Sequence, residues 1–210
     1  MKTLLWDVDT QKDFIEEDGR LAVDGADSIR ENLKKITEHG RKEDLRIWGS
    51  ADYHTPQDEE ISDDPDLKET FPPHCLKDTD GWKRIPETKP EDPLWIDSDP
   101  LEAGDLEQRL KDQNSEIYFR KQNFDVFSNP NLDKALDQID AFQVAIYGVT
   151  LDVCVNYAVE GFLERDYQVT VIEDATRAID EVKREDLLFN WKNLGAQVIG
   201  TEEALSGYIL

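Results

Sequence analysis

Cys154, one of only two cysteines in the chain, stands where an apolar run gives way to a helix-like segment. Residues 141–146 before it favour a strand, and residues 155–165 after it look helical. Free backbone N–H groups at a helix N-terminus favour an anion, so the sequence predicts a thiol pKa below roughly 8.5 and a nucleophilic role. A buried structural cysteine is the alternative. We interpret Cys75 as a buried structural cysteine, because nothing near it in the sequence looks like a base.

A thiolate that attacks an amide needs a partner that passes a proton to the leaving amine. Of the three histidines, His39 is expected at a solvated helix end, and His54 and His74 fit another role. The carboxylate of Asp9 is then the best candidate. A lysine near both groups would stabilise the thiolate. Lys121 is suitable, although strand alternation alone does not choose between Arg120 and Lys121.

A second set of side chains has the composition of a metal site. Asp52 and His54 stand two residues apart, so they share one side of an extended segment. His74 follows two prolines and adds a second imidazole. One carboxylate and two imidazoles suit Zn²⁺, Mn²⁺ or Fe²⁺. Six of the nine residues 58–66 are acidic, and Glu60 is our first choice for a further ligand, while the run as a whole is interpreted as a solvated loop.

The elements that must position these residues alternate between strands and helices, which predicts a three-layer α/β/α fold around a central, mostly parallel sheet. Strands are expected at residues 3–9, 45–51, 116–122, 142–150, 168–173 and 197–200, and helices at residues 28–39, 131–139, 152–165, 180–194 and from 202 onward. Ligands bind at the carboxyl ends of such strands. Asp9, Asp52, Lys121 and Cys154 each follow or end a different strand, so we expect them at one edge.

Composition narrows the classes of protein and partner. The 210 residues suit one domain, 1–210, with an acidic, Pro-rich excursion at about 55–115. The 48 acidic and 24 basic side chains give a formal charge of −24, which disfavours nucleic acid and anionic membranes as partners. This acidity fits a salt-rich cytoplasm or an ordinary acidic enzyme. Two cysteines and the absence of a signal-peptide or membrane-span pattern predict a cytoplasmic protein.

Five motifs in series resemble the isochorismatase-like cysteine hydrolases, and among them the nicotinamidases. They extend from residue 3 to about 200. The matching segments are Asp9-Thr10-Gln11-Lys12-Asp13-Phe14, Asp52-Tyr53-His54, Phe71-Pro72-Pro73-His74-Cys75, Lys121, and Gly148-Val149-Thr150-Leu151-Asp152-Val153-Cys154.

The resemblance implies roles for these residues. Asp9, Lys121 and Cys154 would be the catalytic triad, and Asp52, His54 and His74 would hold a divalent metal, zinc first. Phe14 and Phe71 would contact the substrate ring. A cis peptide bond would precede Thr150, and the N–H groups of Thr150 and Cys154 would form an oxyanion hole.

Some segments depart from the family pattern. The family usually has a small residue and then Thr where this chain has Thr150-Leu151. Residues 123–128 resemble the broader hydrolase family, and the segment 77–115 is unmatched. These departures bear on the substrate more than on the chemistry.

The resulting hypothesis is a metal-assisted amidohydrolase that converts nicotinamide, or a close aromatic amide, to the acid and ammonia, in NAD salvage. The alternatives are hydrolysis of another amide, a ureido compound or a vinyl ether, and a non-catalytic metal-binding protein on the same fold. A homo-oligomer is left open. A dinucleotide-binding fold is rejected because Asp7-Val8-Asp9-Thr10-Gln11 follows the first strand in place of G-x-G-x-x-G.

Overall fold

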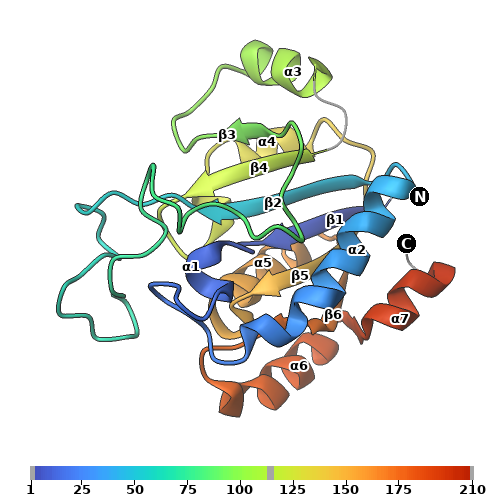
Figure 1. Ribbon diagram of the computed structural model, residues 1–210. Coiled ribbons are helices and arrows are strands. Elements are labelled where there is room, and N and C mark those ends of the chain that lie inside the picture. The colour runs from blue at the N-terminus through green and yellow to red at the C-terminus, as the bar shows by residue number, and fades with distance from the viewer. Residues whose placement is uncertain (1–2, 113–115, 209–210) are drawn as a thin grey trace.

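One parallel sheet organises the chain (Figure 1). The computed structural model describes residues 3–112 and 116–208. Neighbouring strands of the sheet all run parallel, in the order β3-β4-β2-β1-β5-β6-β7. The strands are β1 (Thr3–Val8), β2 (Arg46–Asp52), β3 (Leu94–Ile96), β4 (Glu116–Lys121), β5 (Gln143–Val149), β6 (Gln168–Arg177) and β7 (Gln197–Ile199).

Helices cover both faces of the sheet, which confirms the predicted three-layer α/β/α fold. One apolar cluster joins the sheet to α1 (Lys12–Ile15) and α2 (Arg30–Lys42), with the short helices η1 (Ala26–Ile29) and η5 (Ala204–Tyr208). The short helix α7 (Thr201–Glu203) directly precedes η5. The other cluster joins the sheet to α3 (Ala103–Asp112), α4 (Leu132–Leu136), α5 (Asn156–Leu163) and α6 (Arg184–Asn193), with η2 (Val126–Ser128) and η3 (Leu151–Val155). The short helix η4 (Glu181–Lys183) leads into α6.

The strands of the sheet begin and end close to their predicted positions. The apolar runs that predict them are buried on both faces, as parallel strands require. β6 is longer than expected because it continues past Glu173 to Arg177. Within the excursion the structure adds β3 and α3, and residues 113–115 at its end lie outside the described residues. The terminal residues 1–2 and 209–210 of the predicted domain lie outside them as well.

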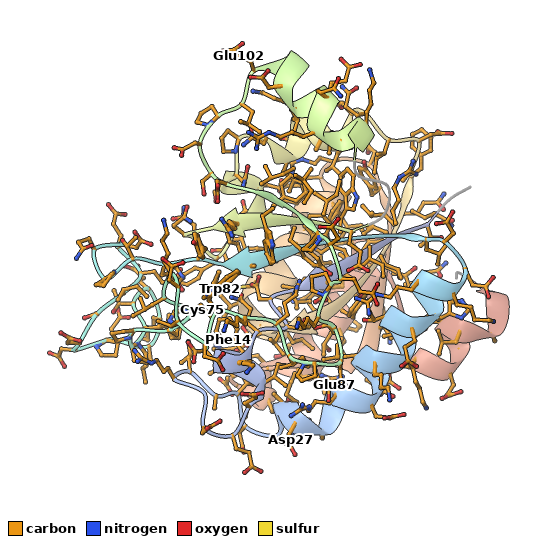
Figure 2. All side chains as sticks on the ribbon, turned by 45° about the horizontal axis from the view of Figure 1, so that its top comes forward. Phe14, Asp27, Cys75, Trp82, Glu87 and Glu102 are labelled. Carbon is orange, nitrogen blue, oxygen red and sulfur yellow. The ribbon has the colours of Figure 1, made fainter. Side chains whose placement is uncertain are left out.

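The first half of the excursion is tied to the residues that follow β1. The backbone N–H of Cys75 donates to Asp13 Oδ2 at 2.7 Å, and Gln11 Nε2 donates to the carbonyl of Trp82 at 2.7 Å. The labelled side chains of Phe14, Cys75 and Trp82 accordingly lie in one region (Figure 2). The excursion is therefore part of the molecule's main body, and it brings residues 54–75 to the carboxyl end of β1.

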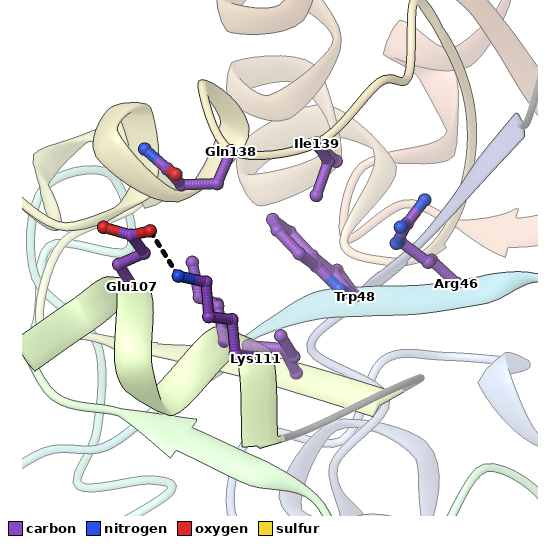
Figure 3. Close-up of a pocket in the computed structure, with 8 residues that line it drawn as sticks. Arg46, Trp48, Glu107, Lys111, Gln138 and Ile139 are labelled. Atoms are coloured by element: carbon purple, nitrogen blue, oxygen red, sulfur yellow. Dashed lines mark hydrogen bonds and ion pairs between the residues drawn. The ribbon is translucent and has the colours of Figure 1, made fainter.

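The helix α3 leaves a small pocket of about 220 Å³ beside β2 and the residues that follow α4 (Figure 3). Glu107 and Lys111 on α3 form an ion pair at 2.5 Å at its rim, while Trp48 of β2 points into it. No helix in the described parts of the chain is both long enough and apolar enough to cross a membrane.

Candidate active site

Four strands deliver charged or reactive side chains to one edge of the sheet. Asp9 follows β1 with a left-handed backbone, φ 47°. Asp52 and Lys121 are the last residues of β2 and β4, and the parallel register places them side by side. Cys154 lies in η3, the π-helical turn between β5 and α5. The expected meeting of these four residues therefore follows from strand register, since the carboxyl ends of parallel strands share an edge.

Lys121 is the centre of this cluster. Its Nζ contacts an oxygen of Asp52, lies 3.0 Å from Asp9 Oδ2 and donates to Cys154 Sγ at 3.4 Å. The side chains of Lys121, Asp9 and Asp52 are at most 1% exposed. One buried cation thus faces two carboxylates and a thiol.

Burial and this cation set the pKa values of the cluster. Burial raises the pKa of Asp9, against the nearby Lys121 charge, which lowers it. Burial alone would lower the pKa of Lys121, but Asp52 and Asp9 outweigh it and raise that pKa well above its usual range. The carboxyl of Asp9 therefore holds a proton more readily than an exposed one, and Lys121 is charged.

The expectation of a lowered Cys154 pKa is wrong. Burial raises the pKa of the Cys154 thiol well above its usual range, and Lys121 offsets this only in part. The Cys154 side chain is buried and close to Asp9 and Asp52, whose charges also disfavour a thiolate, and these effects outweigh that of the helix N-terminus. In the resting protein the thiol keeps its proton, so a nucleophilic role needs a base beside it.

Neighbouring polar side chains hold Asp9 and Asp52 in position. Ser50 Oγ donates to Asp9 Oδ1 at 2.7 Å. The Gln11 side chain holds the backbone of Asp52 from both sides, donating to its carbonyl and accepting from its N–H, each at 2.8 Å. Sequence reasoning did not single out Ser50, whose signal is its position directly before the Ala51-Asp52 strand end.

The second predicted set also converges. Asp52, His54, Glu60 and His74 are all buried, and each offers one ligand atom within 4.8 Å of the others. Glu60 lies with them as chosen from the acidic run, and Asp58 contacts His54. The neighbours Asp63, Asp64 and Asp66 are exposed, as the solvated-loop interpretation expects. Asp52 belongs to both sets, so the metal candidates adjoin the Lys121 cluster.

The two imidazoles have the orientation of metal ligands. His74 Nδ1 lies 2.8 Å from the Pro72 carbonyl, and His54 Nδ1 lies 3.3 Å from Asp58 Oδ2, so both Nε2 atoms face the carboxylates. His54 Nε2 is buried without a hydrogen-bond partner among the described residues. Hydrogen-bond partners at Nδ1, here the Pro72 carbonyl and Asp58, commonly orient metal-bound histidines. Two carboxylates and two imidazoles therefore fit a divalent ion, zinc among them.

Electrostatics supports the same interpretation. Burial alone would lower the pKa of His74, but Asp52 and Glu60 outweigh it and raise that pKa to about 10. Burial would also raise the pKa of Asp52, yet Lys121 and the two histidines hold it well below its usual range. The carboxylates thus favour a cation between the imidazoles, either a proton or a divalent ion that replaces it.

Aromatic side chains surround the metal candidates. Phe14 lies in the buried core with its ring 5.3 Å from the His74 ring, and Phe71 is 5% exposed and meets His74 edge-on. Phe71 in turn contacts Phe124, which stacks on Tyr157 at 6.2 Å. Sequence reasoning gave no role to Tyr157 or to Phe124 of the segment 123–128, because no matched motif assigns one to either residue.

A cavity of about 360 Å³ opens beside Glu60. It is lined by Glu59, Glu60, Glu69, Thr70, Asn123, Phe124, Asp125 and Tyr157. It shares Glu60 with the metal candidates, so it offers a path from solvent toward them.

The turn between β5 and η3 has the backbone that the resemblance implies. The Val149–Thr150 peptide bond is cis, and Thr150 precedes the π-helical turn that carries Cys154. Leu151, the departure from the family pattern, is fully buried in the apolar core. It is thereby accommodated as a core residue.

Comparison with known proteins agrees with this arrangement. The family model of the isochorismatase domain matches residues 3–203. The chain belongs to the isochorismatase family. The match spans the excursion, including the segment 77–115 that we found unmatched, so that segment lies within the family domain.

The curated relatives of this isochorismatase-family protein are distant. A nicotinamidase/pyrazinamidase of Mycobacterium tuberculosis is 24% identical over 176 residues, 82% of this chain and 84% of that protein. A probable inactive nicotinamidase of Arabidopsis thaliana is also 24% identical, over 196 residues, 93% of this chain and 90% of that protein. Since one relative is named a nicotinamidase/pyrazinamidase and the other a probable inactive nicotinamidase, these relatives do not show turnover by this chain.

Solved structures share the fold. A nicotinamidase/pyrazinamidase of Bacillus subtilis superposes with a TM-score of 0.75 at 21% identity, covering 95% of this chain and 100% of that one. A pyrazinamidase of Pyrococcus horikoshii in complex with zinc gives 0.73 at 19% identity, covering 95% and 99%. An N-carbamoylsarcosine amidase of Thermoplasma acidophilum gives 0.72 at 25% identity, covering 96% and 98%.

Proposed function

We propose that this isochorismatase-family protein is a metal-assisted cysteine amidohydrolase that converts nicotinamide, or a close uncharged aromatic amide, to the acid and ammonia. The observation that carries the proposal is Lys121, whose Nζ contacts Asp9, Asp52 and Cys154 together. This lysine lies beside the proposed nucleophile, Cys154, the proposed proton carrier, Asp9, and Asp52 of the metal candidates. A scaffold without turnover has no need for that buried arrangement.

The first half-reaction forms a thioester. Cys154 Sγ attacks the carboxamide carbon while its proton passes to Asp9, whose raised pKa suits a group that must accept and then release a proton. Asp9 gives that proton to the amide nitrogen, the C–N bond breaks and ammonia departs. Lys121 stays charged and stabilises each anion that forms beside it.

The second half-reaction releases the acid. A water molecule loses a proton to Asp9 and attacks the thioester carbon, the C–S bond breaks, and the proton returns to Sγ. In both halves the N–H groups of Thr150 and Cys154 would stabilise the oxyanion, where one lost donor typically costs about 3 kcal/mol.

The metal candidates would orient the substrate. Asp52, His54, Glu60 and His74 would hold the ion, with zinc favoured and manganese or iron as alternatives. The chemistry that such an ion supplies is a coordination position for the ring nitrogen of the amide. Phe71 and Phe124 would pack against the ring, and Phe14 would act through His74, whose ring it contacts.

The cavity beside Glu60 supports an uncharged substrate. Four of its lining side chains are acidic, namely Glu59, Glu60, Glu69 and Asp125, and among the described residues that line it none is basic. A substrate with its own carboxylate, such as a carbamoylated amino acid, would meet unfavourable potential at this mouth. The acid product would be repelled outward.

The test is ammonia release by zinc- or manganese-loaded protein. We expect release from nicotinamide by the wild type and by Cys75→Ala, and none by Cys154→Ala, because Lys121 donates to the thiol of Cys154. A panel with benzamide and an N-carbamoyl amino acid measures the preference for uncharged aromatic amides.

The outcomes separate the rival functions. Release from the carbamoylated compound alone would keep the hydrolase and discard nicotinamide as substrate. Binding of about one metal per chain with no release from any amide would favour the non-catalytic protein, the state that the Arabidopsis relative's name describes.

A further inference from the structure

A second cavity, of about 460 Å³, lies apart from the proposed active site. Its walls come from β3, from residues 82–93 of the excursion and from Lys12 at the start of α1. None of its lining residues belongs to the Lys121 cluster or to the metal candidates. Its volume falls in the range of small-molecule sites.

The walls of this cavity suit a flat ring. Trp82 and Trp95 meet edge to face with centroids 5.4 Å apart, and Pro86, Pro90 and Pro93 line the remaining apolar surface. Indole and proline surfaces of this kind stack on planar aromatic ligands. Both tryptophans are only partly buried, so an incoming ring can reach them.

The charge around the cavity is opposite to that of the molecule. The chain has 48 acidic and 24 basic side chains, yet the charged residues lining this cavity are all basic: Lys12, Lys83, Arg84 and Lys89. Asp80 pairs with Lys12 at 2.6 Å and with Lys83 at 2.9 Å, and Arg84 is buried against Asp7. Glu87 is held by Arg30 at 2.9 Å. Lys89 is exposed, and the exposed acids Glu91 and Asp92 of the same segment do not line the cavity.

The aromatic wall is already held in place. Arg120 stacks 5.4 Å from the Trp82 ring centroid and 5.1 Å from that of Trp95. The carbonyls of Trp82 and Lys83 accept hydrogen bonds from Gln11 Nε2 at 2.7 Å and the Lys12 N–H at 2.8 Å. A wall fixed before binding loses little freedom when a ligand arrives.

We propose that this cavity is a second ligand site, which binds a small planar aromatic ring carrying a carboxylate or phosphate. The ring stacks on Trp82 and Trp95, and the anion lies at the rim with Lys83 and Lys89. The site differs in charge preference from the acidic mouth beside Glu60, so the two cavities select opposite classes of ligand.

The test is calorimetric titration of the metal-loaded full-length protein with 2-naphthoate and with its uncharged analogue 2-naphthalenemethanol. We expect one naphthoate per chain and roughly tenfold weaker binding of the uncharged probe. Trp95→Leu should weaken naphthoate binding roughly tenfold, because stacking on an aromatic side chain is lost. Lys83→Gln/Lys89→Gln should weaken it several-fold, whereas the control Lys34→Gln on α2 should not.

Four results would overturn the proposal. The first is no saturable binding, and the second is binding unchanged in both the Trp95 and the lysine variants. The third is displacement of naphthoate by nicotinamide, which would place the probe in the active site. The fourth is a wild-type dimer in sedimentation that Trp95→Leu dissociates, which would make this surface a subunit interface.

Discussion

Lys121 shows what strand alternation leaves undecided at the scale of single residues. Alternation left Arg120 and Lys121 open, the family resemblance favoured Lys121, and the fold places Lys121 beside Asp9 and Cys154. Lys121 is 1% exposed among Asp9, Asp52 and Cys154, whereas Arg120 points to the other face and stacks 4.1 Å from the Tyr53 ring centroid. The register between β2 and β4 decides this, and register depends on pairing that no local pattern encodes.

Lys121→Met is expected to abolish activity. The change leaves Asp9 and Asp52 as buried carboxylates without their cation, so we expect at least a hundredfold loss in kcat/KM. The unfolding free energy should fall by roughly 3–5 kcal/mol. Steady-state kinetics and urea unfolding measure both.

Arg120→Met is the matched control, one residue away on the same strand. It should retain most of its activity, since Arg120 touches neither Asp9 nor Cys154. Equal losses in the two variants would contradict the role given to Lys121.

Asp58 provides a test of the metal candidates. Its carboxylate lies beside His54 Nδ1 and accepts from the Thr55 N–H at 2.9 Å, so it orients the imidazole. Asp58→Asn should weaken zinc binding by roughly tenfold to a hundredfold, the range found for outer partners of metal ligands. Competition with a chelating dye measures this, and Asp64→Asn, exposed in the same run, should bind zinc like the wild type. Unchanged affinity in Asp58→Asn would remove His54 from the ligand set.

Among the elements, the long buried strands and the short β7 were predictable, whereas the short β3 was not. Apolar runs such as β1 and β5 predict a parallel strand because burial on both faces demands continuous hydrophobicity. β3 spans three residues after Pro93 and has too little pattern to detect, and α3 is polar except on the side that includes Leu106. The closing of the excursion over Gln11 and Asp13 depends on contacts distant in sequence, which periodicity does not record.

The close packing of β5 against β1 depends on a glycine at position 148. Its φ is 116°, a region that favours glycine, and an added Cβ would collide with the backbone of Val8. Gly148→Ala should therefore lower the unfolding free energy by more than about 2 kcal/mol and displace the turn that carries Cys154.

Gly104→Ala in α3 is the comparison, because nothing lies within 4 Å of a Cβ there. It should be neutral or stabilising by up to about 1 kcal/mol, since alanine favours helix. Chemical denaturation of both variants measures the difference. A tolerated Gly148→Ala would show that β1 and β5 can separate without loss.

At the scale of the whole molecule, the contribution of Asp7 to stability should fall as pH rises from about 4 to about 6. Burial raises the pKa of Asp7 from 3.8 to about 6, against the nearby Arg84, which lowers it. A raised carboxyl pKa means that the folded state binds more protons than the unfolded state in this window. The group's contribution is full below the unfolded pKa and is lost as pH rises through the folded one, on the order of 3 kcal/mol.

Unfolding midpoints in urea at pH 4, 5, 6 and 7 measure this dependence. Asp9, whose pKa burial also raises, adds a slope of the same sign. In Asp7→Asn the decline between pH 4 and pH 6 should be shallower than in the wild type, whatever the offset caused by leaving Arg84 unpaired. An identical slope would show that Asp7 is already ionised at pH 4.

The composition describes the charge of the whole molecule and not its local distribution. A formal charge of −24 disfavours polyanions as partners of the whole molecule. It does not reveal that acids gather at the cavity beside Glu60 while the lysines Lys83 and Lys89 stand at the cavity beside Trp95. That division arises only when the excursion folds back over the sheet.

The most direct test of the proposed chemistry is mass spectrometry, intact and after digestion to peptides, of the metal-loaded protein quenched during turnover of nicotinamide. The mechanism predicts a mass increase of one acyl group on the peptide that contains Cys154. The adduct should persist in Cys75→Ala and be absent in Cys154→Ala. Ammonia release by a chain that never carries the adduct, or an adduct on Cys75, would contradict the assignment of Cys154 as the nucleophile.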